Sequence, residues 1–287
     1  MRRIIAAAMA LCLLLAGCAA GGAPASNSAE RANIEGIRDR VAAAAQIISS
    51  VNAIIDWQIE NSEKSIEEAD AARQKGEAYV EEDRTEEIRQ KQAELEGFLE
   101  TVTAYSDWAS SLRPCGQESM DVSYEAAAKY FSEVESALED MAAIMDFYFA
   151  FLEAVEPISS FDSAAYGTDQ DRIYAMYYAV DDVSTALSEL DCPEFMSQTF
   201  KLYISRLEHF MAILNEQYIG VQLNDPLRLS SGIYMLVRVE QEHYDYGVML
   251  TRDFNLQYGK VGERLGGWVG ELGTELAENC AALLRAM

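Results

Sequence analysis

Apolar residues recur at alternating steps of three and four over residues 28–75, and this spacing constrains the fold more than any other feature. The alternation places the residues on one stripe of a helix, as in the seam of a coiled coil. The positions that share the stripe are Ile34, Ile37, Val41, Ala44, Ile48, Val51, Ile55, Ile59, Ile66 and Ala69. The pattern predicts one long amphipathic helix over residues 28–75.

A second stripe follows a charged, glycine-containing stretch at residues 76–87. Its apolar members are Ile88, Leu95, Phe98, Val102, Tyr105, Ala109 and Leu112. Two long amphipathic helices in succession predict an antiparallel, coiled-coil-like hairpin over residues 29–113. Its charged end, within residues 60–100, is expected to project into solvent. A single helix that continues through Gly76 is the alternative.

Prolines are scarce, and they mark corners in the rest of the chain. Of the five, Pro157, Pro193 and Pro226 stand between segments with a helical period, the last two at the first turn of a helix. No long run of Val, Ile or Thr alternates with polar residues, so no sheet is expected. The sequence therefore predicts an all-α helical bundle of about six to seven helices, in which residues 114–287 pack with the hairpin.

Glycines recur at three- and four-residue steps near the C-terminus, at Gly259, Gly262, Gly266, Gly270 and Gly273. Each glycine costs a helix about 1 kcal/mol relative to alanine, so a stripe of them needs a reason. Small residues on one face let another backbone approach closely. We expect a packed helix here rather than a disordered tail.

The N-terminus has the pattern of a secretory signal. Two arginines precede an uncharged apolar run over residues 4–15, which is shorter than the roughly 20 residues that span a bilayer. The run ends in Leu15-Ala16-Gly17-Cys18. This motif resembles the lipobox of bacterial lipoproteins.

The resemblance implies a specific processing of the chain. Residues 1–17 would be removed as a signal peptide, the Cys18 thiol would carry a diacylglyceryl group, and residues 18–28 would form a flexible tether. The protein would be held on the extracytoplasmic face of the cell membrane, with the lipid anchor as its membrane contact. An ordinary signal peptide that is cleaved after Ala20 or Ala23 is the alternative.

The chain is strongly acidic, with a formal net charge of −26. This charge excludes nucleic acid binding through phosphates. It is interpreted as a source of solubility. Cation binding or a basic partner is the alternative, but no compact acidic loop of calcium-binding type occurs.

Three cysteines remain once Cys12 leaves with the signal and Cys18 is lipidated. They are Cys115, Cys192 and Cys280. A Cys115–Cys192 disulfide is one candidate pairing, since each lies beside a proline at a helix–helix corner in an oxidising compartment. No cysteine or histidine spacing indicates zinc.

No catalytic constellation stands out, and the chain is expected not to be an enzyme. No Gly-x-Ser-x-Gly elbow occurs. The best metal motif is Glu240-x-x-His243, which is half of the pattern in di-iron carboxylate bundles. Because its second copy is missing, no metal and no cofactor are expected.

Tyrosines cluster at Tyr174, Tyr177 and Tyr178, and again around Tyr244. Spaced on helices, they either line a ligand groove or form the edge of the core. The favoured function is a non-enzymatic helical interaction or scaffold module that presents its faces to another envelope protein. A small-ligand sensor or carrier with an aromatic pocket between helices is the alternative.

Overall fold

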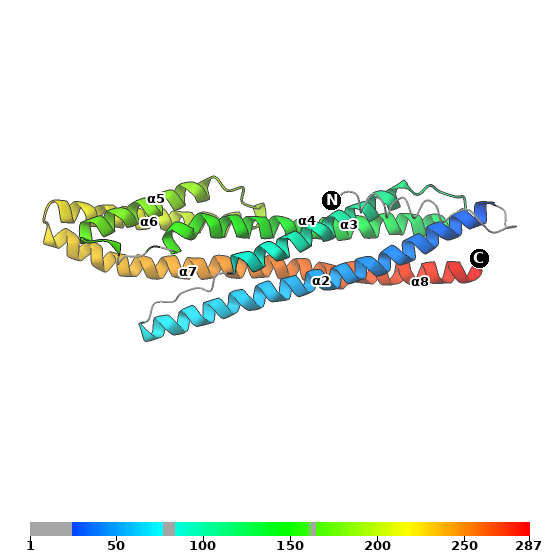
Figure 1. Cartoon of the computed structure of the whole chain (residues 1–287), viewed down its shortest axis with the longest axis horizontal. Coiled ribbons are helices and arrows are strands. Elements are labelled where there is room, and N and C mark those ends of the chain that lie inside the picture. Colours follow the sequence, from blue (N-terminus) through cyan, green and yellow to red (C-terminus); the bar gives the residue numbers. More distant parts are fainter. Residues whose placement is uncertain (1–24, 77–83, 160, 162–164) are drawn as a thin grey trace.

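The computed structural model describes residues 25–76, 84–159, 161 and 165–287, and within these it contains helices and no strand. This confirms the predicted all-α bundle. The seven α-helices are α2 (Ala25–Lys75), α3 (Thr85–Ser111), α4 (Glu118–Ser159), α5 (Asp169–Ser188), α6 (Ser197–Gln222), α7 (Pro226–Arg264) and α8 (Gly270–Ala286) (Figure 1). A 3₁₀ turn, η2 (Glu194–Met196), precedes α6, and a π-helical turn, η3 (Leu265–Val269), joins α7 to α8.

The helix boundaries follow local chemistry. Gly76 ends α2 with φ +71, a left-handed conformation that glycine adopts without steric cost. The alternative of one helix through Gly76 is therefore wrong. At the other end, α2 begins at Ala25, so the last residues of the predicted tether are helical. Residues 1–24, which include Cys18, and residues 77–83 of the charged tip lie outside the described residues.

The first long helix pairs antiparallel with the last two. Ser62 Oγ donates to Asn255 Oδ1 over 2.8 Å, and the Tyr244 hydroxyl donates to Asp70 over 2.8 Å. Further back along α2, Ile55 lies against Gly262. The charged second half of α2 thus lies along α7 and does not project into solvent as predicted. Its apolar stripe continues into this contact, because Ile66 and Ala69 are buried.

The two helices of the predicted hairpin are antiparallel, but they do not pack mainly on each other. Helices α2 and α3 run in opposite directions (Figure 1), yet α3 packs chiefly on α4. Arg89 pairs with Glu153 at 3.4 Å. Nearer the other end of the pair, the Tyr105 and Phe131 rings lie 5.7 Å apart. The predicted segments 29–113 and 114–287 therefore share one apolar core.

The bundle is elongated. The start of α2 and the end of α8 lie at one end, and the turn between α6 and α7 lies at the other (Figure 1). The nearly continuous helix from Pro226 to Ala286 accounts for this length, since a rise of 1.5 Å per residue gives about 90 Å. Among the described residues, no helix is both long and apolar enough to cross a membrane.

Most of the C-terminal glycines do not make the close approach that the sequence predicts. A Cβ at Gly259 would meet nothing within 4 Å, and one at Gly262 would make ordinary contacts. Only at Gly273 is the space fully occupied: a Cβ would lie 2.8 Å from the ring of Tyr130. The close neighbour is an aromatic side chain, not a backbone.

We expect the change Gly273→Ala to destabilise the protein, because the buried Tyr130 ring occupies the space that the new methyl group needs. Overpacking of this kind costs about 1–3 kcal/mol. The matched change Gly259→Ala is expected to raise the free energy of unfolding by up to about 1 kcal/mol, through helix propensity alone. Urea denaturation of both variants measures the difference. Equal effects would contradict the packing at Gly273.

Candidate functional site

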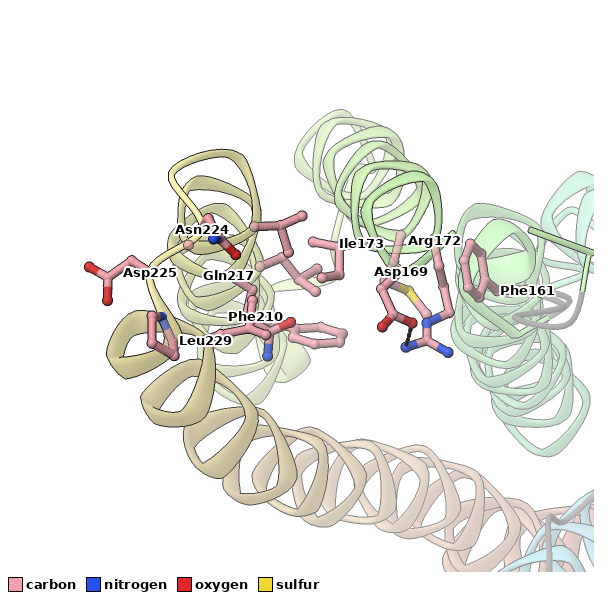
Figure 2. Close-up of a pocket in the computed structure, with 14 residues that line it drawn as sticks. Phe161, Asp169, Arg172, Ile173, Phe210, Gln217, Asn224, Asp225 and Leu229 are labelled. Carbon is pink, nitrogen blue, oxygen red and sulfur yellow. Dashed lines mark hydrogen bonds and ion pairs between the residues drawn. The ribbon is translucent and has the colours of Figure 1, made fainter. Parts of the chain in front are cut away.

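A cavity of about 750 Å³ opens between α5, α6 and the start of α7, at the α6–α7 end of the bundle (Figure 2). Small-molecule sites commonly have volumes of roughly 300–1,000 Å³. Most of its wall is apolar, from Ile173, Met176, Phe210, Leu214, Val221 and Leu229. The cavity is therefore suited to an apolar molecule.

The turn that closes one side of the cavity is fixed by helix capping. The Asp225 side chain accepts from the backbone N–H groups of Leu227 and Arg228, and Pro226 stands in the first turn of α7. This agrees with the helix start that the sequence predicts at Pro226. Gly220 lets α7 return close to α6, because a Cβ there would lie 3.2 Å from the backbone nitrogen of Leu229.

The charged groups of the wall are all paired. Arg172 donates to Asp169 over 2.8 Å, within the first turn of α5 (Figure 2). The Asp225 carboxylate is held by the backbone of α7. Such pairing leaves the interior of the cavity without a free charge.

Gln217 is the exception to the apolar lining of α6. It occupies a position of the buried stripe that includes Phe210 and Leu214, and only 2 % of it is exposed. Its Nε2 has no hydrogen-bond partner among the described residues. A buried amide without a partner carries an uncompensated desolvation cost.

A polar layer lies next to the cavity, between α6 and α7. His243 Nε2 is 3.3 Å from the Tyr203 hydroxyl, and Arg206 pairs with Glu242 at 3.2 Å. The Phe210 ring joins the two regions, since its centroid is 6.2 Å from that of His243. Burial lowers the pKa of His243 to about 4, so the imidazole is neutral at pH 7.

The four tyrosines of the predicted pocket do not line this cavity. Tyr174 and Tyr178 are exposed and share a hydrogen bond of 2.5 Å between their hydroxyls. Tyr177 is half-buried against the core. Tyr244 lies on α7, where the Arg73 guanidinium is 4.3 Å from its ring centroid. Successive helical residues point about 100° apart, so the cavity receives other side chains of α5.

The predicted disulfide is not formed. Cys115, Cys192 and Cys280 are all free. Cys115 Sγ lies 3.8 Å from the sulfur of Met120, and Cys192 Sγ lies 3.5 Å from the carbonyl oxygen of Pro193. Burial raises the pKa of Cys192 and of Cys280 to about 11. Both thiols are protonated at neutral pH, which makes them weak nucleophiles.

The weak metal motif gains no further ligands. Among the residues that the structure describes, no three His, Cys, Asp or Glu side chains are grouped to hold a metal ion. His243 faces Tyr203, and the side chain of Glu240 lies outside the described part of the chain.

Comparison of the chain with protein-family models, curated protein sequences and solved structures finds no match. The site therefore rests on its own geometry. Sequence reasoning missed Gln217, although a signal was present: it is the one polar residue in the buried stripe of α6 that runs from Phe200 to Gly220 through Leu207 and Phe210. A lone amide on an apolar stripe marks either a polar partner or a ligand.

The buried imidazole predicts a pH dependence of stability. The pKa of His243 is lowered to about 4 in the folded protein, and an unfolded histidine titrates near about 6.5. The unfolded chain therefore binds this proton first, and the free energy of unfolding should fall by about 1–2 kcal/mol between pH 7 and pH 5. Urea denaturation at several pH values measures the loss.

The control for this prediction is the chain's second histidine. His243→Gln is expected to remove this part of the pH dependence, whereas His209→Gln, at an exposed position, keeps the wild-type dependence. A His243→Gln variant with the wild-type pH dependence would show that the buried imidazole is not responsible.

Proposed function

We propose that this protein is an extracytoplasmic lipoprotein that acts as a non-enzymatic helical interaction module. A lipid on Cys18 would hold it to the cell membrane, and its far end would contact another protein of the envelope. The observation that carries this proposal is an exposed apolar tip at the end of the bundle opposite the anchor.

The tip is formed by Leu223, Leu227, Tyr234 and Met235, around the α6–α7 turn. Leu227 and Tyr234 are each 79 % exposed. Large apolar side chains gathered at one exposed place are typical of interaction surfaces. Their burial against a partner would release the water that now covers them.

The geometry of the anchor supports the same proposal. Helix α2 begins at Ala25, seven residues after Cys18, and such a segment spans at most about 25 Å. The start of α2 therefore stays near the membrane, together with the end of α8 (Figure 1). The tip lies about 90 Å further along the bundle.

Site-specific photo-cross-linking in intact cells tests this function. A photoreactive amino acid at Leu227 and, separately, at Tyr234 is expected to give the same cross-linked envelope protein, because both side chains belong to the tip. Val122 is the matched control. It is also apolar and 57 % exposed, but it lies near Tyr124, which contacts Asn33 at the anchored end.

A cross-linked product from Val122 alone, or none from either tip position, would contradict the proposal.

Mass spectrometry of the same preparation tests the anchor. The mature chain should begin at Cys18 and carry a diacylglyceryl group. An unmodified chain that begins at Gly21 or Pro24 would show an ordinary signal peptide instead.

A further inference from the structure

We infer that the cavity between α5, α6 and α7 binds a small, uncharged, largely apolar molecule whose acceptor oxygen receives a hydrogen bond from the Gln217 amide. The cavity adjoins the apolar tip at the α6–α7 turn, but none of the four tip residues lines it. It does not depend on a lipid anchor or on a protein partner.

The first argument is the shape and chemistry of the wall. The cavity has a volume of about 750 Å³ and is lined mainly by apolar side chains of α5, α6 and α7 and by Phe161. Figure 2 shows Ile173 of α5 facing Phe210 and Gln217 of α6 across this space. Apolar walls with a few fixed polar groups are the usual composition of small-molecule sites.

The second argument is the position of Gln217. A Cβ at Gly232 would lie 2.5 Å from Cγ of Gln217, so the stem of the side chain is held against the backbone of α7. Gln217 is one of the residues that line the cavity, and its Nε2 itself is buried. The terminal torsion of the side chain is soft, so a rotation of the amide is needed to present Nε2 to a ligand.

The unpartnered amide also indicates what the ligand supplies. Gln217 is almost fully buried, and its Nε2 has no acceptor among the described residues. A leucine of similar size would fill the same stripe without that cost. An acceptor oxygen on the ligand would satisfy the nitrogen, and the adjacent apolar surface would cover the rest of the molecule.

The third argument concerns charge. Arg172 is neutralised by Asp169 at 2.8 Å, and Asp225 is held at the start of α7. No charged residue of the lining is left to pair with an ion. An anion would in addition be repelled by a protein of net charge −26. The ligand that fits is therefore uncharged.

The test uses two related probes. Prodan is an uncharged naphthalene dye with a carbonyl acceptor, and its fluorescence shifts to the blue in an apolar site. The second probe is the same dye without its propionyl group, which has no carbonyl. The protein is the chain from residue 18 with Cys18→Ser, which carries no lipid and retains every residue of the described core.

Prodan is expected to bind saturably, with one molecule per chain. Gln217→Leu should weaken Prodan roughly tenfold and change the carbonyl-free dye by less than about twofold, because only the hydrogen bond is lost. Gln222→Leu makes the same change at an exposed position of the same helix and should alter neither. Ile173→Trp adds a bulky ring to the wall that faces Phe210 and Gln217 and should weaken the binding of both dyes.

A stability measurement separates a binding role from a structural one. Gln217→Leu should unfold at the wild-type temperature or above, because it removes a buried amide without a partner. Three outcomes would overturn the inference: no saturable Prodan binding, binding that Ile173→Trp leaves unchanged, or equal weakening of both dyes by Gln217→Leu. None of them depends on whether a partner is captured at the tip.

Discussion

The antiparallel contact between α2 and α7–α8 organises the structure, because it joins the two ends of the chain along one seam. Polar groups fix its register within an apolar contact. Ser62 is bonded to Asn255, which also donates to Glu63. A buried polar pair of this kind penalises any slip of one helix past the other, since a slip would take Asn255 away from both of its partners on α2. Arg264 of α7 forms ion pairs with Glu133 and Asp140, which link α7 to α4.

The seam has a consequence for the far end of the bundle. Helix α2 ends at Lys75, beside the middle of α7, where Arg73 is bonded to Gln241. The first turns of α7 therefore extend beyond α2 and pack on α6 instead. This end of the bundle is formed by α5, α6 and the start of α7, and α2 does not reach it (Figure 1). The cavity lies at this end, where α2 supplies no side chain to fill the space between the helices.

The sequence predicts most of the elements but not their pairing, and Pro157, which was expected at a corner, lies inside α4. Local signals predict helix boundaries, such as the start at Pro226 and the break that begins at Gly76, because capping and left-handed turns depend on a few neighbouring residues. An apolar stripe shows that a helix is buried, but not against which partner. Because α3 follows α2 along the chain, the sequence predicts that these two helices pack on each other. In the structure, α3 packs chiefly on α4 instead. The same limit applies to the site: Tyr174 and Ile173 are neighbours in sequence, yet only Ile173 lines the cavity.

The elongated bundle separates a predicted anchor at one end from an apolar tip and a cavity at the other. Small-angle X-ray scattering of the unlipidated protein measures this separation most directly. A rod about 90 Å long should have a radius of gyration of about 27 Å, according to the helical rise. A compact globule of this size has a radius of gyration of about 18 Å. A measured value near the first supports the elongated bundle, and a value near the second would contradict it.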